Sequence, residues 1–139
     1  MNLLVTLVLC AALCLPAAMA RAADNEEAPA IAAATKWLAL CDAGSYADSW
    51  QEASSFFRGA ITEKAWADTL TGIRKPLGAV KDRTRQSSML TRSLPGAPDG
   101  SYVVLTYQTE FANKANALET VTFLLDKDGS WRAAGYFIK

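Results

Sequence analysis

The chain has 139 residues, enough for one small domain, and 51% of them are apolar. Lys and Arg together number 14, Asp and Glu also number 14, and there is no His. This balance gives no electrostatic basis for binding nucleic acid or an anionic membrane surface, and the lack of His excludes catalytic triads that use one.

The apolar residues are concentrated at the start of the chain, where 19 of the first 23 residues are apolar. Leu3–Leu15 forms an almost uninterrupted apolar stretch, which Pro16 and a run of small residues follow. The stretch is shorter than the roughly 20 residues that span a bilayer. It predicts a cleavable signal peptide in residues 1–23, cut after Ala20 or Ala23, and export to the periplasm or the exterior of a Gram-negative bacterium.

Residues 24–139 are predicted to form one domain, because they are about 45% apolar and contain neither a linker nor an internal repeat. Cys41 is the only cysteine in this part, so no disulfide can form within it. It falls within an apolar stripe and is predicted to be a buried, unreactive thiol. The chain lacks the nitrogen and sulfur ligands that zinc favours, and we expect neither a metal nor a cofactor.

The first part of this domain is predicted to be helical. Residues 24–29 are acidic without periodicity and are expected to be a flexible lead-in. Three short amphipathic helices follow, over 30–44, 45–59 and 62–78, because apolar residues recur there at spacings of 3 and 4. Ser45 and Thr62 are suitable N-caps for the second and third of these helices.

After residue 78 the apolar residues alternate, which indicates strands. Clusters of Gly, Pro, Asn and Asp between the alternating segments are typical of turns. The expected strands cover 80–93, 101–111, 117–126 and 131–138. Helices followed by a four-stranded antiparallel meander predict an α+β fold, with three N-terminal helices packed on one face of a curved sheet.

The expected sheet carries apolar residues on both faces. Tyr102 and Val104 lie opposite Val103 in the second strand. The last strand is expected to divide its apolar residues, with Trp131 and Phe137 on one face and Tyr136 and Ile138 on the other. Two interpretations stay open: scattered apolar residues on a solvated face, or a homodimer that buries this face.

One acid stands out as a candidate site residue. Glu119 shares a face with Val121, so it is expected to point toward the helices, where burial would suit it to general acid/base work. Arg74, at the end of the third helix, could clamp Glu119 or a ligand carboxylate, and Tyr107 could stabilise developing charge. The alternatives are a solvated or Arg-paired Glu119 and a purely helix-terminal role for Arg74.

A stripe of positive charge is expected on the first strand. Lys81, Arg83 and Arg85 alternate, which places them on one face. Such a stripe could dock an anionic ligand, a phospholipid head group or an acidic partner. More often, charge on a first strand protects the sheet edge against aggregation.

Several motifs combine aromatic residues with Gly and Pro: Trp37, Asp42-x-Gly44-x-Tyr46-x-x-Ser49-Trp50, Arg74-x-Pro76-Leu77-Gly78, Ser93-Leu94-Pro95-Gly96-Ala97-Pro98-Asp99-Gly100-x-Tyr102, and Asp128-Gly129-x-Trp131-Arg132. These motifs resemble the bacterial DUF4019 family over nearly all of residues 30–139. The resemblance implies a small exported domain with no established activity, and it transfers no site residue. The order of elements is similar to that of NTF2-like and cystatin-like folds, which host enzymes and binding modules alike.

The sequence therefore favours a non-catalytic module of the cell envelope that binds a small molecule or an envelope protein. A small acid/base isomerase or lyase that uses Glu119 is the alternative. A third possibility is an interaction domain that uses an exposed strand edge.

Overall fold

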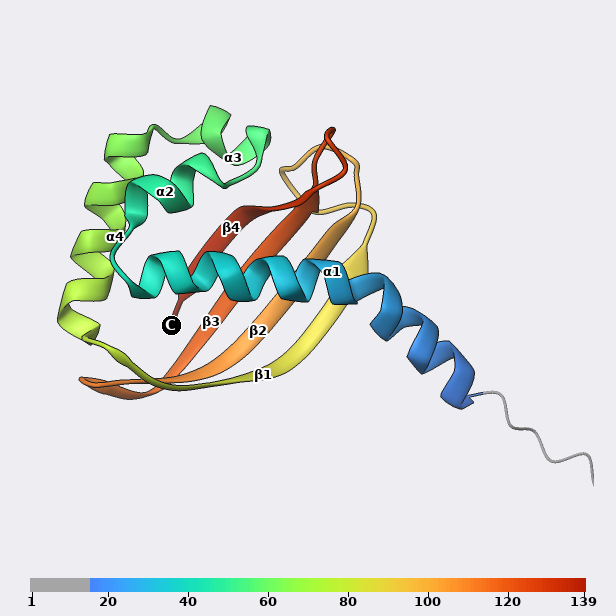
Figure 1. Ribbon diagram of the computed structural model, residues 1–139, viewed down its shortest axis with the longest axis horizontal. Helices are drawn as coiled ribbons and strands as arrows, with labels where there is room; N and C mark the ends of the chain where they lie inside the picture. The colour runs from blue at the N-terminus through green and yellow to red at the C-terminus, as the bar shows by residue number, and fades with distance from the viewer. Residues whose placement is uncertain (1–15) are drawn as a thin grey trace, which may run out of the picture.

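The computed structural model describes residues 16–139, with side chains from residue 26 onward, so the apolar stretch 3–15 of the expected signal peptide lies outside the described residues. Four helices precede four strands (Figure 1). The elements are α1 (Pro16–Asp42), α2 (Tyr46–Gln51), α3 (Ser55–Ala60), α4 (Glu63–Leu77), β1 (Val80–Thr91), β2 (Tyr102–Phe111), β3 (Lys114–Leu125) and β4 (Trp131–Ile138). The α+β class and the four-stranded sheet are confirmed.

The sheet is an antiparallel meander with the strand order β1-β2-β3-β4. Figure 1 shows α1 lying across one face of this sheet, where it contacts all four strands, while α2, α3 and α4 gather beyond the β4 side. Among the described residues, no helix is both long and apolar enough to cross a membrane. We call the face toward α1 the inner face and the opposite one the outer face.

The expected flexible lead-in over 24–29 is wrong, because α1 continues through these residues and includes Pro29. Glu27 is buried and fastens this part of α1 to the sheet. Its Oε1 accepts a hydrogen bond from the backbone N–H of Leu90 at 3.1 Å, and its Oε2 accepts one from the Ser88 hydroxyl. The acidic composition suggested solvent exposure, but this carboxylate accepts a hydrogen bond from a backbone amide of β1, one of the two edge strands.

The second expected helix is two helices, so the structure has four helices instead of three. The break falls at Ser54, whose hydroxyl accepts a hydrogen bond from the Phe57 N–H at 3.1 Å and so caps α3. The N–H of Ser54 donates to the Ala133 carbonyl of β4 at 2.8 Å. Ser54 is buried, and its hydrogen bonds go to the following turn and to a strand. These bonds favour the start of a new helix over continuation of α2.

The predicted ends of the last helix are confirmed. Thr62 caps α4 by accepting a hydrogen bond from the Ala65 N–H at 3.2 Å. Gly78 follows the last residue with φ of 76°, a left-handed conformation that glycine adopts without strain. Ser45 does occupy the N-cap of α2, but its side chain makes no capping hydrogen bond.

Two strand features differ from expectation. β3 begins at Lys114, three residues earlier than expected, because a two-residue turn replaces the longer loop. In β4 a register shift changes the faces: Trp131 pairs with Leu125 and Tyr136 with Val121. Trp131 and Tyr136 therefore both pack against the inner-face core instead of opposing each other.

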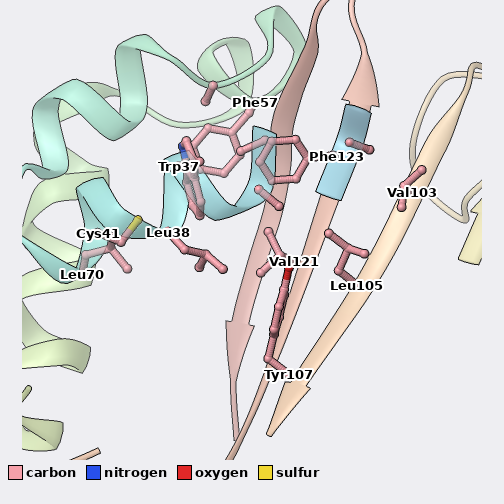
Figure 2. Close-up of a cluster of buried hydrophobic side chains, with 14 of the residues drawn as sticks. Trp37, Leu38, Cys41, Phe57, Leu70, Val103, Leu105, Tyr107, Val121 and Phe123 are labelled. Atoms are coloured by element: carbon pink, nitrogen blue, oxygen red, sulfur yellow. The ribbon is translucent and has the colours of Figure 1, made fainter. Parts of the chain in front are cut away.

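The core lies between α1 and the inner face, and Trp37 of α1 is its centre (Figure 2). The Trp37 ring packs edge-on against Phe123 and Tyr136, with centroids 6.2 and 5.5 Å away. Its indole N–H donates to the Ser49 carbonyl at 2.8 Å. Cys41 is buried in the same cluster, as predicted, and burial raises the pKa of its thiol to about 12. A thiol with this pKa stays protonated near neutral pH.

The outer face is apolar in part. The loop before β2 covers one end of it, where the Tyr102 hydroxyl donates to the Pro98 carbonyl at 2.5 Å. Elsewhere this face leaves three large apolar side chains exposed: Met89 by 53%, Leu118 by 39% and Phe137 by 67%. The excess of apolar residues read from the sequence is thus present on this face.

Candidate functional site

Glu119 is completely buried and lies at the centre of a polar cluster on the inner face. One side chain from each of the other three strands donates to its carboxylate. These donors are Arg83 Nε of β1 at 2.6 Å, the Thr109 hydroxyl of β2 at 2.5 Å, and the Tyr136 hydroxyl of β4. Burial, together with the neighbouring Glu119 carboxylate, raises the pKa of Tyr136, so its phenol remains a donor.

Asp42, in the last turn of α1, extends the cluster to the helices. It accepts hydrogen bonds from Arg74 Nη2 of α4 and Arg83 Nη1 of β1, each at 2.7 Å. Burial alone would raise the pKa of Asp42, but hydrogen bonds from both guanidinium groups hold it below the ordinary value. Burial likewise opposes the charge on Arg83, yet its hydrogen bonds to Asp42 and Glu119 raise its pKa. We call Asp42, Arg74, Arg83, Glu119 and Tyr136 the charge cluster.

The cluster differs from the pairing considered from the sequence. Arg74 binds Asp42, and the guanidinium group that holds Glu119 belongs to Arg83. The sequence placed Arg83 on one face of the first strand together with Lys81 and Arg85, without pairing it with Glu119. The structure inserts a register shift at Lys81 and pairs Arg83 with Thr109 on the inner face. Edge protection is therefore not the role of Arg83, whose side chain is only 15% exposed.

Tyr107 is buried on the inner face, opposite Glu119 in the register of β2 and β3 (Figure 2). Its hydroxyl has no hydrogen-bond partner within the described part of the chain. Burial raises its pKa, so it stays protonated near neutral pH. Tyr107 is thus close to the charge cluster without bonding to it.

A cleft opens elsewhere, between α1, α2 and the start of β4, with a volume of about 490 Å³. Its base is formed by the buried rings of Trp37 and Phe123 and the half-buried ring of Trp131. Charged side chains are also part of its lining: Lys36 from α1, Asp48 and Glu52 from α2 and its C-cap, and Arg132 from β4. We call this the Trp131 cleft. Its volume suits a small-molecule ligand.

A second, more polar cleft of about 450 Å³ adjoins the first and shares Gln51, Glu52 and Arg132 with it. Arg132 lies between two carboxylates here. Its Nη2 is 2.7 Å from Oδ2 of Asp128, and its Nη1 is 3.6 Å from Oε2 of Glu52. Within residues 26–139, no group of three or more Asp, Glu, Cys or His residues is placed to hold a metal ion.

The residues singled out in the sequence line neither cleft: Arg74, Tyr107 and Glu119 all belong to the inner-face core. Sequence reasoning missed the Trp131 cleft, although a signal was present. Asp48 and Glu52 stand four residues apart on one face of a helix, and Lys36 flanks Trp37. Only the packing of α2 beside α1 brings these residues around Trp131.

Comparison with curated proteins gives no match, and comparison with solved structures gives none either. The model of one protein family matches residues 33–136, which include the charge cluster and all the residues that line the two clefts. This family is described as a protein of unknown function (DUF4019), and the extent of the match shows that the chain belongs to it.

Proposed function

We propose that this protein is an exported, non-catalytic module of the bacterial cell envelope that binds a small molecule in the Trp131 cleft. The observation that carries the proposal is the cleft itself, with about 490 Å³ of open volume, an aromatic base and charged walls. Binding sites for small molecules commonly combine an apolar base with a few polar groups that fix orientation.

The charge cluster favours binding over acid/base catalysis. A base must reach a substrate proton within about 3 Å, yet donors from three strands surround the Glu119 carboxylate. Each carboxylate oxygen already accepts from two donors. Glu119 is thus placed to hold strands together, and the Trp131 cleft is the better candidate site.

A thermal-shift screen of the mature protein tests binding. The panel contains amino acids, short peptides, sugars and aromatic acids. At a concentration about ten times Kd, a ligand adds about 1.4 kcal/mol, which raises Tm by roughly 4–6 °C for a domain of this size. We expect at least one of these classes of compound to raise Tm by this amount.

A matched pair of variants locates the binding. Ala33 lines the cleft, whereas the neighbouring Ala32 is exposed and does not. Ala33→Phe fills the cleft and is expected to abolish the shift, while Ala32→Phe preserves it. The proposal would be contradicted if no class of compound raised Tm, or if a ligand raised the Tm of Ala33→Phe as much as that of the wild type.

Export is supported by the apolar segment 3–15 and by how α1 would begin after cleavage. Removal of residues 1–23 would leave Glu26 and Glu27 at the start of α1, where negative charge is favourable, and Pro29 near the first turn, where proline is tolerated. The hydrogen bonds that the Glu27 carboxylate accepts from Ser88 and Leu90 of β1 would be retained. Expression of the full chain in a Gram-negative bacterium should yield a periplasmic protein that begins at Arg21 or Asp24, as mass spectrometry would show. An uncleaved cytoplasmic chain would refute export.

We also propose that a second copy covers the outer face. The exposed side chains of Met89, Leu118 and Phe137 support this, and a net charge of only −1 over residues 24–139 does not oppose self-association. Sedimentation equilibrium of residues 24–139 should give a dimer, and Phe137→Lys a monomer. Ile73→Lys, which places the same charge at an exposed apolar position on α4, away from the outer face, is the control and should remain dimeric. A monomeric wild-type protein at millimolar concentration would exclude the dimer.

A further inference from the structure

We propose that the ligand of the Trp131 cleft is a small zwitterion with an aromatic or large apolar side chain, that is, a free amino acid or a short peptide. This inference rests on the proposed function, because it names the chemical class that the same cleft would bind. It follows from how the charges and the rings around the cleft are arranged.

The base of the cleft would receive the apolar part of such a ligand. Trp37 and Phe123 are almost fully buried and packed edge-on, so they make the base of the cleft rigid but expose little surface themselves. Trp131 and Leu40 are half-buried and contribute the accessible apolar surface. An apolar or aromatic side chain placed there gains burial and ring contacts without displacing a hydrogen-bonded group.

The walls carry charge of both signs in equal number. The lining contains two cations, Lys36 and Arg132, and two carboxylates, Asp48 and Glu52. Asp48 and Glu52 are four residues apart on α2 and its C-cap, so they share one face, and Lys36 comes from α1. A ligand with charge of one sign would be attracted by one set and repelled by the other, whereas a zwitterion matches both.

Lys36 and Asp48 differ from the other two charged residues of the cleft. Across residues 26–139, neither Lys36 nor Asp48 forms an ion pair. Arg132, in contrast, is held by Asp128 at 2.7 Å and lies 3.6 Å from Glu52. Lys36 is therefore the group placed to bind a ligand carboxylate, and Asp48, with Glu52, the group placed to bind its ammonium.

Isothermal titration calorimetry with related probes tests the inference. L-Phenylalanine and the dipeptide alanyl-phenylalanine carry both charges and distinguish a free amino acid from a peptide. N-Acetylphenylalanine lacks the ammonium group, phenylalaninamide lacks the carboxylate, and glycine lacks the side chain. We expect at least one zwitterionic probe to bind and each of the three deficient probes to bind about three- to tenfold more weakly.

Two variants test which residue of the cleft binds which charged group of the ligand. Lys36→Met should weaken binding of the zwitterion but leave binding of phenylalaninamide unchanged, because that probe has no carboxylate to lose. Asp48→Asn should weaken binding of the zwitterion but leave binding of N-acetylphenylalanine unchanged, because that probe has no ammonium group. The controls are Lys64→Met and Asp68→Asn, an exposed pair on α4 that lines neither cleft, and both should bind like the wild type.

The outcomes separate the two proposals. If capped phenylalanine derivatives bind as tightly as the zwitterions, the charge assignment is wrong while the binding function stands. If no probe binds but the wider thermal-shift panel contains a ligand that Ala33→Phe excludes, the zwitterion inference alone fails. If neither experiment finds a ligand, both proposals fail.

Discussion

Arg83 of β1 and Glu119 of β3 form an ion pair across the intervening strand β2, with 2.6 Å between Nε and Oε1. Thr109 of β2 donates to the same oxygen, and Tyr136 of β4 donates to the other. Through Asp42 and Arg74 the cluster continues into α1 and α4. One buried carboxylate thus connects all four strands, and its partners connect the sheet to two helices. We interpret the charge cluster as the feature that sets how the helices sit on the sheet.

Loss of the central carboxylate should strongly destabilise the fold. Glu119→Leu removes the acceptor of three donors and leaves Arg83 partly unpaired, which typically costs about 3–5 kcal/mol. Urea denaturation measures this change in the free energy of unfolding. Glu110→Leu, an exposed position on the outer face, is the control and should change it by less than about 0.5 kcal/mol. Adding Arg83→Met to Glu119→Leu should recover part of the loss; a purely additive loss would mean that the two residues are not coupled.

The buried hydroxyl of Ser49 should matter more than its size suggests. It accepts the Trp66 indole N–H at 2.9 Å and donates to the Tyr46 carbonyl at 2.7 Å. Ser49→Ala leaves a buried indole N–H without its acceptor, so we expect a loss of about 1–3 kcal/mol in unfolding free energy. Ser45→Ala, which removes a hydroxyl that makes no capping bond, is the matched comparison. Equal effects of the two substitutions would argue against a role for the Trp66 hydrogen bond.

Replacing each of two glycines, one within α4 and one directly after it, by alanine should change stability in opposite directions. Gly78 has φ of 76°, and a Cβ there would lie 3.0 Å from the Ala112 Cβ, so Gly78→Ala should destabilise by more than about 1 kcal/mol. Gly72 lies inside α4 in open space, and Gly72→Ala should stabilise by about 0.5–1 kcal/mol. Thermal denaturation distinguishes the two, and a stabilising Gly78→Ala would show that the left-handed turn is not required.

Stability should fall at alkaline pH because of Cys41. Burial raises the pKa of its thiol from 9.0 to about 12, so above pH 9 the unfolded chain loses this proton first. Since the folded state then binds more protons, a rise in pH favours unfolding. Between about pH 8 and about pH 10 the wild type should lose about 1.4 kcal/mol more than Cys41→Ser, which has no thiol to titrate. Parallel pH profiles for the two proteins would mean that the thiol is solvated in the folded state.

The sequence predicted what depends on local pattern. The alternation of apolar residues located all four strands, and the caps at Thr62 and Gly78 bounded α4. The break at Ser54 was missed because the apolar spacing continues through it, while the bond from its N–H to Ala133 depends on tertiary packing. Burial of Glu119 followed from alternation, but its partner Arg83 did not, because a register shift at Lys81 cannot be read from periodicity. The charged residues of the Trp131 cleft were visible in the sequence, but their assembly into one site was not, because it depends on how α1, α2 and β4 pack together.

The most direct test of the central claim is a titration followed by the indole ¹H–¹⁵N resonances of the four tryptophans. The titrant is the compound that stabilises the protein most in the thermal-shift screen. Binding in the cleft should shift the Trp131 resonance saturably, while the indole of Trp66, buried and hydrogen-bonded to Ser49, keeps its position. A saturable change elsewhere with an unperturbed Trp131 resonance would contradict the assignment of this cleft as the binding site.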